Sequence, residues 1–181
     1  MGRQIRPPPG AEETDGGVDR GMGRRETREL ELLVFDLAGR TYGLPSDDVL
    51  ELLRAVAITP LPNGPRIVAG VINLRGLIVP VFDLRIRFGM PSPPLEPSDH
   101  FIVARARHRI VAIRTDRAIH LTTVAGEDVM AAERIVSGTR HISGIAQVKG
   151  DIVLIHDLHG FLSEAEGATL DRAMSAPAEA T

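Results

Sequence analysis

The stretch that decides the fold is residues 70–84, which read Gly-Val-Ile-Asn-Leu-Arg-Gly-Leu-Ile-Val-Pro-Val-Phe-Asp-Leu. Two aliphatic runs flank Arg75-Gly76, and this pattern predicts two antiparallel strands joined by a tight turn. Pro80 lies inside the second run and has no backbone N–H to donate, which predicts a sheet edge or a bulge.

A second copy of this pattern lies 74 residues further on, at residues 144–158. Six of the 15 aligned positions are identical: two glycines, an Ile, a Val, an Asp and a Leu. Residues 33–52 parallel residues 102–121 in the same way, at an offset of 69. This repeat predicts two related β units of about 65 to 70 residues each.

Short apolar runs separated by turn-forming residues continue along most of the chain and predict a mostly β protein. Each unit holds about five such runs, which favours small barrels over a sandwich. Side chains fill a barrel of that size, so the natural groove would lie between the units. The runs are 32–37, 41–44, 49–58, 68–74, 77–82, 101–106, 109–114, 119–124, 142–148 and 152–155.

Two helices complete the predicted elements. Asp83–Phe88, followed by Gly89, predicts a short helix. Ser163 and Glu166 form a capping-box pattern, in which each side chain bonds a free backbone N–H, and predict a C-terminal helix that ends near Met174.

Composition sets the expected domain boundaries. The first residues hold three consecutive prolines, many charges and few apolar side chains, which predicts a disordered tail. A stretch with four prolines would connect the two barrels, and an exchange of a strand or of the terminal helix between them stays open. The expected segments are 1–28 for the tail, 29–175 for the domain, about 29–90 and 98–165 for the barrels, 91–99 for the connector and 176–181 for a flexible end.

Charge and composition exclude several classes of protein. The net charge of −3 and the aromatic content of 3% argue against a nucleic-acid binder, although a small-barrel nucleic-acid-binding protein stays the alternative function. The chain has no cysteine, which excludes disulfides and thiolate chemistry. No apolar run approaches the roughly 20 residues of a membrane helix, and no secretory signal pattern opens the chain, so we expect a cytoplasmic protein.

Motifs of catalysis are missing from the sequence. It holds neither a Gly-rich loop followed by Lys-Ser/Thr nor a Gly-x-Ser-x-Gly elbow. His156 and His159 have the spacing of a metal pair, but no third ligand is signalled. Turns explain the acidic residues Asp36, Asp47 and Asp48 better than paired catalytic carboxylates do. We therefore expect no enzyme, no cofactor and no metal.

Segments 70–76, 78–81 and 83–85 resemble the signature of the chemotaxis coupling protein CheW family. Tyr42-Gly43-Leu44 and Ile142-Ser-Gly-Ile145 match that family in order and spacing. No receiver or kinase domain accompanies these segments, so the chain resembles the stand-alone adaptor.

The resemblance implies two five-stranded, SH3-like barrels without enzymatic activity. Members of the family link the cytoplasmic tips of methyl-accepting chemoreceptors to the regulatory domain of the histidine kinase CheA. We therefore expect a non-catalytic adaptor in the cytoplasm that is recruited to membrane-associated receptor arrays, with no nucleic acid partner and no membrane insertion.

The resemblance also implies coupling roles for residues of this chain, with Glu51 as the local partner of Arg75. Leu121 replaces the usual Val, and His100 stands where a small apolar residue is common. For Arg75 the alternative is a solvated turn arginine, for Gly70 a bulge, and for the apolar candidates a place in the core. The coupling candidates are Val49, Glu51, Gly70, Asn73, Arg75, Gly76, His100 and Leu121, and the possible apolar kinase contacts are Leu52, Ile67 and Val71.

Overall fold

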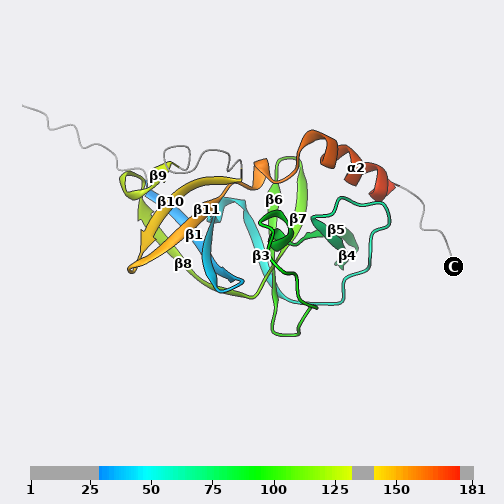
Figure 1. The fold of residues 1–181 in the computed structure, drawn as a ribbon, viewed down its shortest axis with the longest axis horizontal. Helices are drawn as coiled ribbons and strands as arrows, with labels where there is room; N and C mark the ends of the chain where they lie inside the picture. Colours follow the sequence, from blue (N-terminus) through cyan, green and yellow to red (C-terminus); the bar gives the residue numbers. More distant parts are fainter. Residues whose placement is uncertain (1–28, 132–140, 176–181) are drawn as a thin grey trace, which may run out of the picture.

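The computed structural model of the chain describes residues 29–131 and 141–175 (Figure 1). The expected tail at 1–28 and the expected flexible end at 176–181 lie outside the described residues. The described part is mostly β, and each apolar run of the sequence analysis overlaps a strand. The strands are β1 (Glu29–Leu37), β2 (Arg40–Pro45), β3 (Val49–Arg54), β4 (Val68–Leu74), β5 (Leu77–Phe82), β6 (His100–Ala106), β7 (Arg109–Thr115), β8 (Arg117–Ala125), β9 (Met130–Ala131), β10 (Ile142–Val148) and β11 (Asp151–His156).

Both predicted helices are present. Asp83 caps α1 (Leu84–Arg87) by accepting a hydrogen bond from the backbone N–H of Arg85 at 3.0 Å. The predicted capping box opens α2 (Glu164–Ser175): the N–H of Glu166 donates to Ser163 Oγ at 3.2 Å, and the N–H of Ser163 donates to Glu166 Oε2 at 2.9 Å. Single turns of 3-10 helix lie at η1 (Ser46–Asp48), η2 (Gly126–Asp128) and η4 (Leu158–Gly160).

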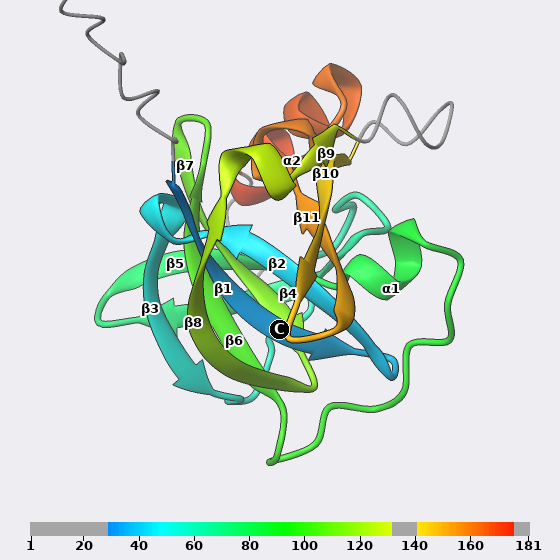
Figure 2. The ribbon, with the colours of Figure 1, turned by 90° about the vertical axis from the view of Figure 1, so that its left-hand side faces the viewer.

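The strands form two sheets that exchange elements along the chain. One has six strands in the order β8-β1-β2-β11-β10-β9, and the other has five in the order β3-β6-β7-β5-β4. The expected barrels at 29–90 and 98–165 are therefore wrong in one respect, because β1 and β2 lie with β8–β11, and β6 and β7 lie with β3–β5 (Figure 2). This is an exchange of the kind that the repeat left open. The helix α2 also lies beside the five-stranded sheet, although it follows the last strand of the other one (Figure 1).

The internal repeat is visible in the strand pairing. β5 runs parallel to β7 in one sheet, and β11 runs parallel to β2 in the other. Both repeated hairpins turn through two residues of positive φ: 50° and 91° at Arg75 and Gly76, and 52° and 95° at Lys149 and Gly150. Turns of this hand match the twist of the flanking strands, which makes two-residue hairpins possible.

Gly70 in β4 is buried where a side chain has no room. Its φ is +149°, and a Cβ there would lie 2.2 Å from the carbonyl oxygen of Thr59. The register of β4 against β5 shifts just before Gly70, so this glycine serves a bulge, which is the structural alternative named above. The register of β10 shifts just before Gly144 as well, where a Cβ would lie 2.7 Å from Cγ1 of Val129. Both copies of the repeat thus have a bulge followed by a glycine at a position with no room for a side chain.

Pro80 lies in an interior strand, because β5 pairs with both β4 and β7, so the expected sheet edge is wrong. It stands opposite Val71, whose N–H and C=O bond to Thr59 at 2.8 and 2.9 Å and not to β5. The parallel ladder with β7 begins one residue later, at Val81. Proline is tolerated there because no ladder hydrogen bond requires its missing N–H.

Three apolar cores hold the sheets together. The largest lies between them and includes Phe35 of β1, Ile102 of β6 and Phe161 after β11. A second fills the concave side of the six-stranded sheet around Val153, and a third fills that of the five-stranded sheet around Val79. We expected a groove between the two units. Packed side chains fill the interior of the interface between the sheets, so that expectation is wrong there.

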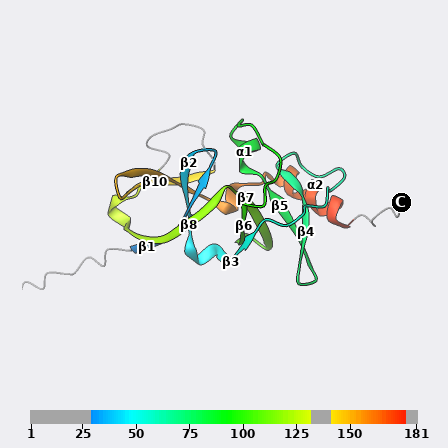
Figure 3. The same cartoon turned by 90° about the horizontal axis from the view of Figure 1, so that it is seen from below.

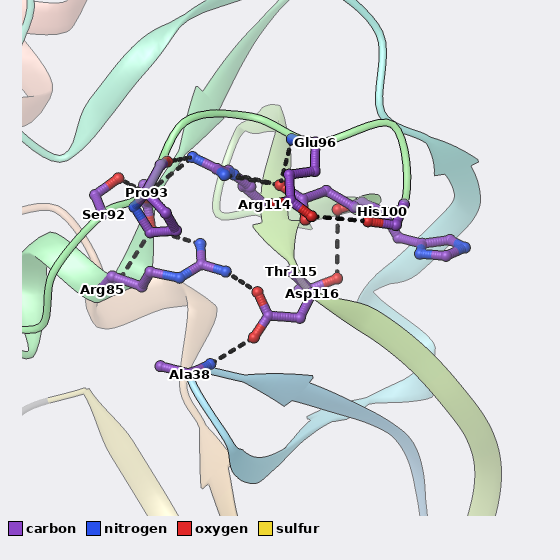
Figure 4. Close-up of polar contacts among 12 residues, drawn as sticks. Ala38, Arg85, Ser92, Pro93, Glu96, His100, Arg114, Thr115 and Asp116 are labelled. Carbon is purple, nitrogen blue, oxygen red and sulfur yellow. Dashed lines mark hydrogen bonds and ion pairs between the residues drawn. The ribbon is translucent and has the colours of Figure 1, made fainter.

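An ionic network around the buried Arg85 joins α1 to the turn between β7 and β8 (Figure 4). The guanidinium of Arg85 is 1% exposed and bonds to Asp83 Oδ1 at 3.2 Å and to Asp116 Oδ1. The second oxygen of Asp116 accepts the N–H of Ala38 in the β1–β2 turn at 2.6 Å. Asp116 thereby ties the two sheets together at the point where the chain passes between them.

The proline-rich connector is fastened by Arg114 of β7. Its guanidinium donates to Asp99 Oδ2 at 2.7 and 2.9 Å, and to the carbonyl oxygens of Pro93 and Pro94 at 2.8 and 2.7 Å (Figure 4). The carbonyl oxygens of such a segment need hydrogen-bond donors, and one guanidinium supplies several in a fixed geometry, so arginine is an effective anchor here.

His156 at the end of β11 is fully buried in an aromatic cluster. Its ring stacks on those of Tyr42 and Phe88, with centroids 5.0 and 5.1 Å apart. One ring nitrogen, Nδ1, is 2.9 Å from the carbonyl oxygen of His141, while Nε2 is buried without a hydrogen-bond partner in the described structure. Burial lowers the pKa of His156 to about 4, so the ring is neutral at physiological pH.

Gly70→Ala should destabilise the protein by about 3 kcal/mol, because the new Cβ adds both backbone strain and a clash with the Thr59 carbonyl. Urea unfolding measures this loss. Gly76→Ala is the matched control: its φ is +91°, but a Cβ there meets nothing within 4 Å, so it should cost about 1 kcal/mol. Equal losses in the two variants would contradict the assigned close approach.

Stability should fall as the pH drops from about 6.5 to about 4, because the unfolded chain protonates His156 and the folded chain does not. At pH 5 this one group costs about 2 kcal/mol relative to neutral pH. His156→Phe should remove that part of the pH dependence while keeping the ring stack; the His141 carbonyl still accepts the N–H of Asp157 at 3.1 Å. Thermal unfolding of both proteins at several pH values tests this, and identical pH profiles would refute it.

Candidate functional site

The β4–β5 hairpin projects from the five-stranded sheet, with Arg75 and Gly76 at its tip (Figure 3). Asn73 closes the turn, since its Oδ1 accepts the N–H of Gly76 at 2.7 Å. The turn residue Arg75 has a 77% exposed side chain. The two-residue turn and the Asn73 bond together hold this arginine at a defined place on an exposed tip.

Glu51 of β3 is the partner of Arg75, as the resemblance implied. The two terminal nitrogens of Arg75 donate to the two carboxylate oxygens of Glu51 at 3.2 and 2.9 Å. Such a fork fixes the plane of the guanidinium. Because the pair is exposed, it contributes only about 0.2 to 1 kcal/mol to stability. Its main effect is therefore to orient Arg75 and to bring the hairpin tip against β3.

Large apolar side chains stay exposed on the strands that carry this ion pair. Leu52 follows Glu51 in β3 and is 45% exposed, and Leu77 and Ile78 follow the turn and are 48% and 49% exposed. Leu50 and Val56 are exposed on the same segment of chain as β3. We call Leu50, Glu51, Leu52, Val56, Asn73, Arg75, Leu77 and Ile78 the hairpin surface. Exposed apolar residues next to an oriented charge are typical of a protein-binding surface.

The sequence analysis named Leu52 but missed Leu50, Val56, Leu77 and Ile78. The apolar residues of β3 run almost without interruption, so no alternation of polar and apolar residues marked which side chains face outwards. The turn position of Leu77 was the available signal, since a residue next to an exposed turn has few neighbours to pack against.

Ile67 is 2% exposed and belongs to the core between the sheets, so its expected role as an apolar contact is wrong. Val49 and Val71 are half-buried, and Val49 packs against the same core. Gly70 is buried beneath Thr59 and offers no surface of its own. None of these four residues is exposed.

His100 and Leu121 lie away from the hairpin tip. His100 begins β6, opposite Arg54 of β3, and its Nδ1 is buried without a partner among the described residues. Leu121 lies on β8 of the other sheet and is 57% exposed. β6 belongs to the five-stranded sheet and β8 to the six-stranded sheet, so the structure places these two candidates on different sheets.

The described residues hold no cluster of three His, Asp or Glu side chains arranged for a metal ion. His156 is buried in its aromatic cluster while His159 is exposed, so the sequence pair does not converge. Asp157 caps η4 by accepting the N–H of His159 at 2.8 Å, as Asp83 caps α1. None of the described helices is both long and apolar enough to cross a bilayer.

Comparison with known proteins identifies relatives over most of the chain. The family model of the CheW-like domain matches residues 31–166. The chain is 28% identical to the chemotaxis protein CheW of Klebsiella aerogenes over 148 residues, which cover 81% of this chain and 89% of that protein. It is 27% identical to protein FrzA of Myxococcus xanthus over 136 residues, covering 74% and 84% of the two chains.

A solved structure agrees with this result. The scaffolding protein TtCheW from Thermoanaerobacter tengcongensis superposes with a TM-score of 0.68 at 28% identity, covering 73% of this chain and 91% of that one. Sequence, strand order and structural likeness point in one direction: this chain belongs to the CheW-like family of chemotaxis adaptor and scaffold proteins.

Proposed function

We propose that this protein is a non-catalytic adaptor that couples methyl-accepting chemoreceptors to the histidine kinase CheA. The observation that carries the proposal is the Arg75–Glu51 fork on a projecting hairpin, with exposed leucine and isoleucine side chains beside it. Similarity to chemotaxis proteins supports the pathway, and similarity to the scaffolding protein TtCheW supports the absence of catalysis.

The exposed fork suits recognition better than stability. An arginine already oriented by Glu51 loses less side-chain freedom when it binds, and its remaining N–H groups can bond a partner carboxylate or carbonyl. The neighbouring apolar side chains would pack against the apolar stripe of a partner helix or strand. We assign the coupling role to Glu51, Leu52, Asn73, Arg75 and Gly76, supported from below by Val49, Gly70 and Val71.

Coupling of this kind needs only modest contacts. A micromolar contact corresponds to about −8 kcal/mol, and many linked contacts in an array add avidity. The adaptor transmits a signal when it binds one conformation of its partners more tightly than another. It would act in the cytoplasm, held at membrane-associated receptor arrays by its partners, with His100 of β6 and Leu121 of β8 as further contacts. The nucleic-acid alternative is not favoured by the net charge of −3.

Arg75→Ala should abolish receptor-dependent activation of the kinase, because the oriented guanidinium is lost while the fold keeps all but about 1 kcal/mol of its stability. Kinase activity reconstituted from receptor, kinase and adaptor measures this. Arg117→Ala is the matched control, since Arg117 is also exposed and paired, with Asp36 at 3.3 Å, but lies on β8. Normal activation by Arg75→Ala, or equal loss in both variants, would refute the assigned site.

A charge swap separates recognition from local stability. The double variant Glu51→Arg with Arg75→Glu retains an ion pair between β3 and the hairpin but reverses the charge presented to a partner. If the fork acts in recognition, the swap should stay inactive in the same kinase assay while unfolding at the same urea concentration as the parent. Restored activation would mean that the pair only stabilises the hairpin.

A further inference from the structure

A pocket of about 290 Å³ lies at the edge of the interface between the sheets, between the β6–β7 hairpin and α2. Phe82, Leu158 and Phe161 line it and are buried, so its inner wall is apolar. None of its lining residues belongs to the hairpin surface. The pocket is therefore a separate feature that the proposed coupling role does not explain.

The size of the pocket suits one large side chain. At about 290 Å³ the pocket lies at the lower limit of small-molecule sites, which enclose about 300 to 1,000 Å³ and bury most of the ligand. Protein interfaces, by contrast, often depend on a single aromatic or aliphatic anchor that fills a pocket of the partner. An apolar wall with a charged mouth fits such an anchor.

Gly167 keeps the pocket open from the helix side. It lies inside α2, where glycine destabilises a helix relative to alanine, and it lines the pocket. A Cβ at this position would meet nothing within 4 Å, so packing does not require glycine there. Gly167 thus lowers the stability of the helix, is not required by packing, and leaves the cavity empty. This combination indicates that the cavity has a function.

One rim of the pocket carries an oriented cation. Arg107 at the tip of the β6–β7 hairpin donates its Nε–H to the carbonyl oxygen of His159 at 2.7 Å and its backbone N–H to His159 Nδ1 at 2.9 Å. Its terminal nitrogens make no hydrogen bond within the described part of the chain. The neighbouring Arg109 is already paired with Asp171 of α2 at 2.8 Å. On the opposite rim, Glu164 stands in the first turn of α2, where the helix dipole stabilises a carboxylate.

We propose that this pocket binds one large apolar side chain of a partner protein, with an acidic residue of that partner next to it on Arg107. The apolar wall takes the anchor, and the fixed guanidinium takes the carboxylate as a charge-assisted hydrogen bond. The open Gly167 face of α2 provides the room that the anchor fills.

The probe is the peptide acetyl-Ala-Phe-Glu-Ala-amide, titrated into the full-length protein and followed by amide chemical shifts. Saturable shifts are expected at 106–109 and 158–171, and the peptides with Ala in place of Phe, or Lys in place of Glu, should each bind about tenfold more weakly or worse. Shifts elsewhere, or no saturable binding at millimolar concentration, would overturn the proposal. So would equal binding of the Lys peptide, or binding of free phenylalanine as tight as that of the peptide, since a small-molecule site would show the latter.

Gly167→Leu tests the pocket itself. The leucine should occupy the cavity, abolish binding of the peptide and leave the unfolding midpoint unchanged or higher, because it removes a helical glycine. Ala165→Leu is the control on the same helix, outside the pocket lining, and should bind as the parent does. Arg107→Asn tests the charge, because asparagine tolerates the positive φ of 55° at that position. Arg105→Gln, at the one exposed position of β6, is its control. Undiminished binding by Gly167→Leu or by Arg107→Asn would refute the assignment.

Discussion

Leu32 and Leu33 are neighbours in β1, yet their side chains enter two different cores. Phe101 and Ile102 of β6 are divided in the same way. Adjacent residues of a strand point to opposite faces, so both faces of these strands are buried. The molecule is thus built as layers of strands between three cores. Burial of both strand faces fixes how the two sheets pack against each other. Burial of both faces increases the apolar area that a strand removes from water, and each Å² of that area contributes about 25 cal/mol.

The hairpin surface depends on this layered interior. β4 and β5 are anchored by the third core below the tip, and the bulge at Gly70 brings Thr59 within hydrogen-bonding distance of Val71. A turn set on such a base presents Arg75 with little freedom. The exposed ion pair with Glu51 then needs only a small energy to select one orientation, because the backbone beneath it is already fixed.

Much of the fold could be predicted because turns and apolar runs are local signals. The Arg75-Gly76 hairpin, the capping box at Ser163 and the cap at Asp83 follow from residues within a few positions of each other. Burial could not be predicted, since a strand buried on both faces reads as a continuous apolar run with no period of two. Ile67, a possible apolar contact for which the core was the alternative, is buried, whereas Ile78, which was not among the candidates, is exposed.

Long-range polar contacts could not be predicted from the sequence either, for a different reason. Arg114 lies 20 and 21 residues from the proline carbonyls it bonds, and Asp116 lies 78 residues from the Ala38 N–H. No spacing rule connects such positions. The resemblance to a family supplied Glu51 as the partner of Arg75, which the residues alone did not.

The exchange of β1–β2 for β6–β7 also bears on how the chain reaches its native state. Neither copy of the repeat contains all the strands of one sheet, so neither is a self-sufficient folding unit. During synthesis, β1 and β5 in the first half keep an unpaired edge until their partners β8 and β7 have been made. Topologies dominated by such distant pairings acquire their order late and slowly. The two halves of the repeat can therefore complete their sheets only together.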